Sequence, residues 1–79
     1  MPRFFFDVSD SGRGFPDTEG TVLADLEHAR EEALETLGQI AKDELPDGDR
    51  REFTIDIRSE AGQILLTASL SLRVDRKLS

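Results

Sequence analysis

The amino-terminal stretch RFFFDVS alternates apolar and polar side chains in a way that is typical of a β-strand. Successive side chains of a strand point to opposite faces, so Phe4, Phe6 and Val8 share one face while Phe5 and Asp7 share the other. The pattern predicts a strand with one apolar face from about the third residue to the ninth.

The residues that follow predict a turn and a broken second strand. Asp10–Gly14 (DSGRG) has turn composition, with two glycines free to adopt positive φ. A short strand at Arg13–Phe15 would return along the first strand and resume at Thr21–Leu23. Pro16 and Gly20 interrupt this second strand, and since proline cannot donate to a strand ladder, we expect it at an edge of the sheet.

Helical periodicity is clearest between Leu26 and Glu44. Apolar residues recur there at spacings of three and four, which predicts a helix with one apolar face. That face consists of Leu26, Ala29, Ala33, Leu34, Leu37, Ile40 and Ala41. Pro46 disfavours helical geometry at the residue before it, so we expect the helix to end there and the PDGD stretch to turn the chain.

The last third of the chain predicts a β-hairpin. Phe53, Ile55 and Ile57 alternate with polar residues. The short connection Glu60–Gly62 supplies a glycine for a left-handed position, and a regular alternation then continues over eleven residues from Ile64. Together with the first strand, the hairpin gives the sheet one apolar face. That face comprises Phe4, Phe6, Val8, Phe53, Ile55, Ile57, Ile64, Leu66, Leu70, Leu72 and Val74.

The order ββαββ predicts an α+β fold, in which an antiparallel-rich sheet carries a single helix packed on one face. Seventy-nine residues without repeats or low-complexity tracts make a single domain, residues 1–79. A chain of this size buries only about 60–65% of its unfolded surface, so we expect modest stability.

Charge is unevenly distributed along the chain, whose net charge is −7. Residues 17–49 contain eleven acidic and two basic side chains, whereas the remainder contains six acidic and eight basic ones. An acidic protein repels phosphate backbones, so we expect no nucleic-acid partner. The acidic block is most simply the solvated face of the predicted helix, and a docking patch for a basic partner is the alternative.

Targeting and redox signals are absent from the sequence. It contains no cysteine, which excludes disulfides, thiolate metal sites and a cysteine nucleophile. The apolar run near the amino end stops at Asp7, before it reaches the roughly 7–15 residues of a signal peptide. No stretch approaches the roughly 18 apolar residues of a membrane span, so we expect no membrane association and a cytoplasmic location.

Four potential ligands or acid–base groups lie close together in the sequence, namely Asp17, Glu19, Asp25 and His28. Asp25 directly precedes the first periodic residue of the helix, where a carboxylate can accept hydrogen bonds from free amides, and Asp17 stands in turn composition. The nearest helical neighbours of His28 are glutamates, and one such pair does not close a zinc site. Neither DTEG nor DGD supplies the alternating acids of a calcium loop. We therefore expect a turn and a helix cap, with no metal and no cofactor.

Catalytic chemistry is not expected either. No serine lies in a nucleophile-elbow context that His28 could serve. DSGRG is not a glycine-rich loop leading into a helix, and a domain of this size seldom encloses a pocket of about 300 Å³. As an outward stacking platform for single-stranded nucleic acid, Phe5 would need further aromatic and basic neighbours. The sequence therefore predicts a protein that is not an enzyme.

Three stretches carry a family resemblance: MPRFFFDVSDSG, DTEGTVLADLEHAREEAL and ELPDGDRREFTIDIRSEAGQILLTASLSL. Together they resemble a family of small bacterial proteins, common in rhizobia and their relatives, that is catalogued as domain of unknown function 6894. The resemblance spans nearly the whole chain. It implies a bacterial, cytoplasmic origin and no particular activity.

A second, fainter resemblance is to the N-terminal domain of HicB-type antitoxins, which carry a Pro-Asp turn ending in glycine and then a helix rich in Glu and Ala. FPDTEG and LEHAREEAL match that pattern here. The resemblance implies a partial RNase-H-like sheet with a helix, and binding of a small toxin. This sequence departs from the family because it places a full hairpin after the helix and carries no separate DNA-binding segment. A toxin-neutralising or regulatory role is therefore the alternative to a general protein-interaction role.

The size of the apolar face predicts self-association. Four strands about 4.8 Å apart make a sheet roughly 19 Å wide, which one helix of about 10–12 Å cannot cover. With a turn centred on Glu60–Ala61, Phe53 would lie opposite about Ala68, and Leu70–Val74 would run past its partner strand with unpaired backbone. We expect a homodimer that uses this end of the last strand, with outward residues of the first and last strands as a second contact surface. The predicted interaction residues are Phe5, Leu65, Leu70, Leu72 and Val74.

Overall fold

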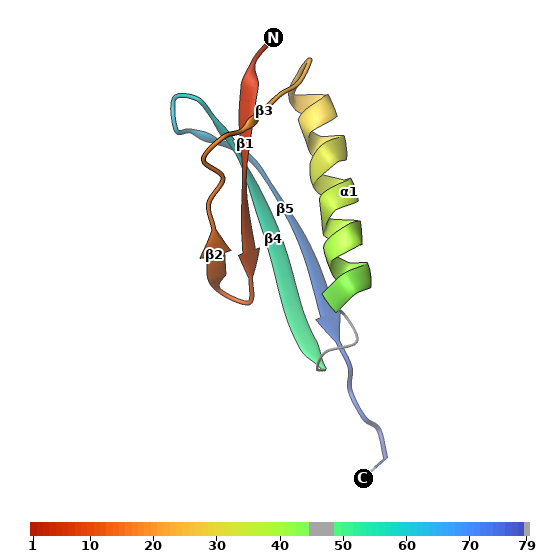
Figure 1. Cartoon of the computed structure of the whole chain (residues 1–79). Helices are drawn as coiled ribbons and strands as arrows, with labels where there is room; N and C mark the ends of the chain where they lie inside the picture. The colour runs from red at the N-terminus through yellow and green to blue at the C-terminus, as the bar shows by residue number, and fades with distance from the viewer. Residues whose placement is uncertain (45–48, 79) are drawn as a thin grey trace.

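The computed structural model describes residues 1–44 and 49–78 and has the α+β architecture that the sequence predicts. Its elements are β1 (Arg3–Asp10), β2 (Arg13–Phe15), β3 (Thr21–Val22), α1 (Leu26–Glu44), β4 (Arg50–Ser59) and β5 (Ile64–Arg73). The helix end predicted at Pro46 and most of the turn predicted after it fall at 45–48, outside the described residues. α1 lies on one face of the sheet, and no described element covers the other face (Figure 1).

Every strand pair of the sheet is antiparallel in the part of the chain that the structure describes. The strand order is β2-β1-β4-β5, and β3 also pairs with β1. β2 pairs with the last three residues of β1 and β3 with its first two, so both lie along the β1 edge that β4 does not occupy. The prediction of a broken second strand at an edge is therefore confirmed. The break leaves Phe5, Phe6 and Asp7 without a strand partner on that side.

The core lies between α1 and the central strands. Phe53, Ile55 and Ile57 of β4 are completely buried, and alanines form most of the helix row that faces the sheet. Because alanine has no side chain beyond Cβ, this row allows the helix to approach the sheet closely. The buried apolar residues are Phe4, Ala29, Ala33, Leu37, Ala41, Phe53, Ile55 and Ile57.

The helix does not cover the whole width of the sheet. α1 packs over β4 and β5, while the β1–β2 side of the same face carries no described helix (Figure 1). Phe6 and Val8 of β1 are consequently only half-buried, and Phe15 of β2 is 54% exposed. The sheet is thus too wide for one helix, as the strand count predicts.

The register of the β4–β5 hairpin corrects the sequence prediction. Phe53 pairs with Leu70 and not with Ala68. The difference of two residues arises near the connection. Arg58 pairs with Ile64, so the turn is centred on Ala61, which accounts for one residue, and a β-bulge at Leu65, which has no partner on β4, accounts for the other. Because the bulge shifts the register, Ile64 pairs with a residue of the face opposite to the helix, and its side chain is 56% exposed. Ile64 therefore does not belong to the helix-covered face where the simple alternation placed it.

The end of β5 is not an overhang. β4 begins at Arg50, opposite Arg73, and the amide of Val74 still donates a hydrogen bond to the carbonyl oxygen of Asp49 at 2.8 Å. The prediction that Leu70–Val74 runs past its partner strand is therefore wrong, because β4 starts earlier and pairs further along than expected. The unpaired backbone lies instead along the other side of β5, where no described strand is adjacent.

Candidate functional site

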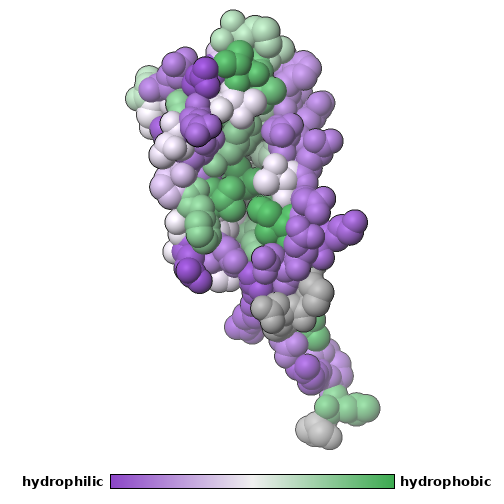
Figure 2. All heavy atoms as spheres, viewed as in Figure 1, coloured by the Kyte–Doolittle hydropathy of each residue, from purple (hydrophilic) through white to green (hydrophobic). Residues whose placement is uncertain are grey.

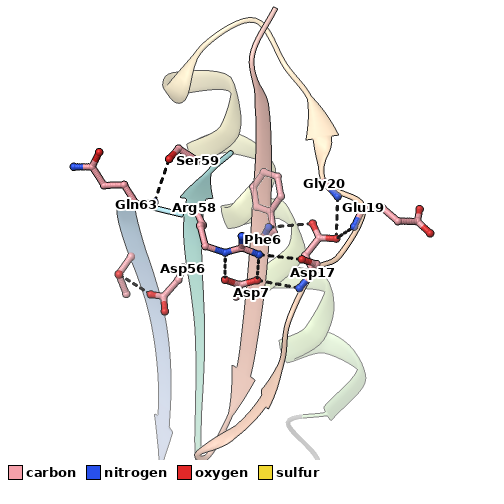
Figure 3. A network of polar contacts seen from close by, with 10 residues as sticks. Phe6, Asp7, Asp17, Glu19, Gly20, Asp56, Arg58, Ser59 and Gln63 are labelled. Atoms are coloured by element: carbon pink, nitrogen blue, oxygen red, sulfur yellow. Dashed lines mark hydrogen bonds and ion pairs between the residues drawn. The ribbon is translucent and has the colours of Figure 1, made fainter. Parts of the chain in front are cut away.

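A polar network on the open face of the sheet joins β4, β1 and the β2–β3 connection (Figure 3). Arg58 of β4 reaches diagonally to Asp7 of β1, and its Nε donates to Asp7 Oδ2 at 2.9 Å while its Nη2 donates to Oδ1 at 3.2 Å. Nη2 also donates to the carbonyl oxygen of Asp17 at 3.0 Å. We refer to Asp7, Asp17 and Arg58 as the arginine clasp.

Asp17 fills the break in the edge strand. Its carboxylate accepts a hydrogen bond from the amide of Phe6 at 3.1 Å and from the amides of Glu19 and Gly20, both also at 3.1 Å. Its own amide donates to Asp7 Oδ1 at 2.9 Å. A backbone donor of β1 that no strand pairs is thereby satisfied by a side chain, which is the usual requirement for a partly buried amide.

Close packing also restricts the residues next to the arginine clasp. Gly20 has a φ of +72°, and a Cβ added there would lie 3.0 Å from the carbonyl oxygen of Phe4 and 3.0 Å from Phe5 Cε1. The guanidinium of Arg58 lies 4.7 Å from the centre of the Phe5 ring. Phe5 is therefore half-buried beneath Arg58, and it offers less outward surface than the strand pattern suggests.

The clasp keeps both of its carboxylates ionised. Hydrogen bonds from Arg58 lower the pKa of Asp7 below its ordinary value of 3.8, although partial burial opposes them. Burial acts to raise the pKa of Asp17, but the three backbone amides that donate to it outweigh burial, and its pKa is also lowered. A general acid or base works best with a pKa near the operating pH, so these carboxylates are suited to anchoring the chain and not to proton transfer near neutrality.

The predicted helix cap at Asp25 is confirmed. α1 begins at the next residue, and the amide of His28 donates to Asp25 Oδ1 at 2.9 Å. The Nδ1 atom of His28 lies 2.7 Å from the same oxygen, and this contact raises the pKa of His28 and lowers that of Asp25. Asp17 belongs to the clasp, and Glu19 contributes its carbonyl oxygen to Arg3 at 2.8 Å. The four candidate groups therefore form no common site: Asp17 and the backbone of Glu19 belong to the corner of the clasp, and Asp25 and His28 belong to the helix cap.

Residues 1–44 and 49–78 were also compared with what a metal site and a membrane-spanning helix require. No group of three or more Asp, Glu, His or Cys side chains in these ranges could hold a metal ion. No helix in them is both long enough and apolar enough to cross a bilayer.

A hollow of about 470 Å³ lies at the end of the β4–β5 hairpin that is remote from its connecting turn. This volume is larger than the sequence led us to expect. It is lined by Ser11, Arg50, Arg51, Glu52, Ser71, Leu72 and Arg73. Two of its arginines already hold carboxylates, since Arg51 binds Asp10 at 2.7 Å and Arg73 binds Asp75 at 2.9 Å. The hollow therefore has little unbalanced charge with which to bind a ligand.

The predicted interaction residues, Phe5 apart, gather on one strand. Leu65 is 38% exposed, Leu70 36% and Val74 47%, while Leu72 is half-buried. All four lie on or directly after β5, which is the edge strand next to β4. The sequence identified this strand but placed its unpaired backbone wrongly, because the register of the β4–β5 hairpin cannot be derived from alternation.

The hydrogen bond from Val74 to Asp49 sets the phase of the β4–β5 ladder. In an antiparallel pair, hydrogen-bonded and non-hydrogen-bonded residue pairs alternate. Every second residue before Val74 therefore bonds to β4, whereas Thr67, Ser69 and Ser71 direct their amides and carbonyls away from it. We call this side of β5 the free edge.

The free edge has few of the features that normally protect an edge strand, namely the bulge at Leu65 near its start and the charged Arg73 at its end. Ile64–Leu72 is a run of nine residues with no charged residue, no proline and no glycine. Natural edge strands usually carry such residues, which prevent pairing with another chain. The opposite edge of this sheet has them, since Pro16, Gly20 and the Asp17 carboxylate interrupt it. The free edge of β5 is therefore the candidate interaction site.

Comparison with known proteins agrees with the resemblance seen in the sequence. The model of a family described as "Domain of unknown function (DUF6894)" matches residues 3–71. The chain belongs to the DUF6894 family. The match extends from the start of β1 almost to the end of β5 and thus includes the clasp and most of the free edge. No curated protein and no solved structure matches the chain.

Proposed function

We propose that this DUF6894 domain is a non-catalytic protein-interaction module that forms a homodimer through the free edge of β5. The observation that supports this most directly is the run Ile64–Leu72, which has no charged residue, proline or glycine and lies beside a strand side that no described element occupies. An edge of this kind is usually paired or covered, because it presents a row of unsatisfied backbone donors and acceptors.

The proposed partner is a second copy, because the edge is complementary to itself in the antiparallel direction. A two-fold axis normal to the sheet and midway between the two Ser69 residues pairs Ser69 with its symmetry mate and Thr67 with Ser71 of the second copy. This register pairs Thr67, Ser69 and Ser71, three of the residues whose backbone groups point to the free edge. It also extends the sheet continuously and places both helices on the same face.

Apolar side chains flank the free edge on the helix side. Leu70 is 36% exposed on β5, and Leu34 is 45% exposed on α1. Leu34 lies about 100° around the helix from the buried Ala33. In Figure 1 the amino end of α1 is at the top and the sheet lies behind the helix. Because an α-helix is right-handed, the residue that follows Ala33 is then rotated toward the β5 side of the sheet. A second copy joined at β5 would cover both leucines, which adds hydrophobic burial to the backbone pairing.

Sedimentation equilibrium at about 50 µM tests the proposal, with a dimer mass as the expected result for the natural sequence. Ser69→Pro removes an amide that points to the free edge and leaves the β4–β5 ladder bonds intact, so it should yield a folded monomer. Ser69→Ala, the matched control, should remain a dimer. A monomer mass for the natural sequence at this concentration would refute the proposal. A complex with a different small protein would instead support the regulatory alternative of the HicB kind.

Single cysteines test the register, since the natural sequence has none. In the proposed register the two Ser69 Cα atoms lie about 5.5 Å apart, within the range that a disulfide spans. Ser69→Cys should therefore cross-link under mild oxidation. Thr67→Cys should not, because the two copies of that residue would lie more than about 10 Å apart. Efficient cross-linking of Thr67→Cys alone would show a different register.

A further inference from the structure

A second apolar surface lies on the helix-covered face, at the side of the sheet that the proposed dimer does not use. Phe6 and Val8 of β1 are half-buried there, and Phe15 of β2 is 54% exposed. Val8 and Phe15 are cross-strand partners, so their side chains share this face. Figure 2 shows apolar side chains gathered between α1 and β2, with polar side chains on both sides. We call Phe6, Val8 and Phe15 the β1 strip.

The dimensions of the uncovered area match those of one helix. α1 packs over β4 and β5, and the two remaining strands of this face are spaced by about 4.7–4.9 Å, which leaves about 10 Å of sheet width. A helix with its side chains is about 10–12 Å across. Two-layer folds of this kind bury an open apolar sheet face by packing a further element on it.

The adjacent flank of α1 carries negative charge without counterions. Glu32 and Asp43 lie about 80–100° around the helix from Ala33, in the sense opposite to Leu34, which turns them toward β1. Neither forms an ion pair with any residue that the structure describes, and Asp43 receives only amide hydrogen bonds from Gln39, both at 3.3 Å. A molecule bound to the β1 strip would therefore lie beside the acidic side chains Glu32 and Asp43 of α1.

From these observations we infer that the β1 strip binds an amphipathic helix of a partner protein. The apolar stripe of that helix would pack on the strip, and Lys or Arg side chains on its flank would face the acidic side of α1. The helix of a second copy does not fit this role, because α1 itself carries six acidic and two basic side chains and would be repelled. An added strand is disfavoured as well, since the neighbouring edge is broken after Phe15.

A synthetic helix tests this inference directly. The probe is a fluorescent peptide of about 18 residues, with leucines at helical spacings of three and four and lysines elsewhere, titrated with the protein while anisotropy is followed. Phe15→Ser should weaken binding about tenfold, because it removes an exposed apolar anchor. Leu65→Ser, a matched apolar-to-polar change at the other side of the sheet, should leave the dissociation constant unchanged. The same peptide with glutamate in place of lysine should not bind.

Each of the other outcomes overturns the inference. Binding that Phe15→Ser does not weaken would mean that the acidic helix attracts the peptide without the strip. Equal weakening by Leu65→Ser, or no binding at about 100 µM protein, would exclude a specific site. A fall in dimer mass caused by Phe15→Ser would show that the strip joins copies of this chain. The Ser69→Pro monomer should bind the peptide as tightly as the natural protein does, which separates this site from the proposed dimer.

Discussion

At Asp17, one carboxylate accepts hydrogen bonds from three backbone amides and thereby replaces the strand pairing that β2 and β3 leave open. Asp17→Ala should lower the free energy of unfolding by about 1–3 kcal/mol, because it leaves partly buried amides without an acceptor. Asp17→Asn should cost less, since an amide oxygen can still accept. Urea denaturation at neutral pH measures both values.

Glu19→Ala is the control, because that side chain is exposed and its carboxylate forms no hydrogen bond with a described residue. It should change stability by less than about 0.5 kcal/mol. A cost for Glu19→Ala as large as that for Asp17→Ala would contradict the role assigned to the carboxylate.

The clasp also predicts how stability depends on acid. The pKa values of Asp7 and Asp17 are lower in the folded protein than the ordinary 3.8, so the unfolded chain binds protons first as the pH falls. Their contribution is fully present above about pH 5 and is lost as the pH drops through 3.8 toward the lower folded values. The urea concentration at the midpoint of unfolding, measured from neutral pH to about pH 2.5, should therefore decrease as the pH drops through this window. The decrease should be less steep for Asp7→Asn than for the natural sequence. An unchanged slope for that variant would exclude Asp7 as a source.

At the scale of the helix, the cap at Asp25 predicts a difference between neighbours. Asp25→Ala removes the acceptor for the amide of His28 and a favourable charge at the amino end of α1, so the melting temperature should fall by several degrees. His28→Ala should lower it less, because the backbone hydrogen bond remains. A larger effect from His28→Ala would mean that the imidazole, and not the cap, stabilises the start of the helix.

Element boundaries were largely predictable, and pairing was not. Helical spacing alone predicted the span Leu26–Glu44, and the interruptions at Pro16 and Gly20 predicted the two short edge strands. The predicted hairpin register was wrong because it depends on the turn centre at Ala61 and on the bulge at Leu65, neither of which alternation reveals. A shift of two residues then changed which backbone groups of β5 were expected to be unpaired.

For the whole molecule, net charge predicts opposite salt effects on the two proposed interactions. Each copy carries a net charge of −7, so association of two copies is opposed by repulsion at low salt. Raising the salt from about 10 mM to about 150 mM shortens the Debye length from about 30 Å to about 8 Å and should tighten the dimer. The same change should weaken the basic peptide at the β1 strip. Sedimentation and anisotropy series measure the two trends, and a shared sign would contradict one of the proposals.

The contacts of the arginine clasp could not be predicted from the sequence. Asp17 was recognised as a turn residue from its neighbours, but its partnership with Arg58 joins positions 41 residues apart. Arg58 meets Asp7 only because β4 pairs with β1 in one particular register. No local pattern contains that information, so the clasp was not predicted.

The sequence by itself determined the elements, the apolar face and the acidic surface of this protein, because each depends on side chains two to four residues apart. Tertiary structure alone decided the strand order, the position of α1 over β4 and β5, and thus which edge and which strip of the sheet remain open. The physical reason is that a strand presents the same alternation whichever neighbour it pairs with. Loop lengths, a single bulge and the width of one helix then select among the possible pairings.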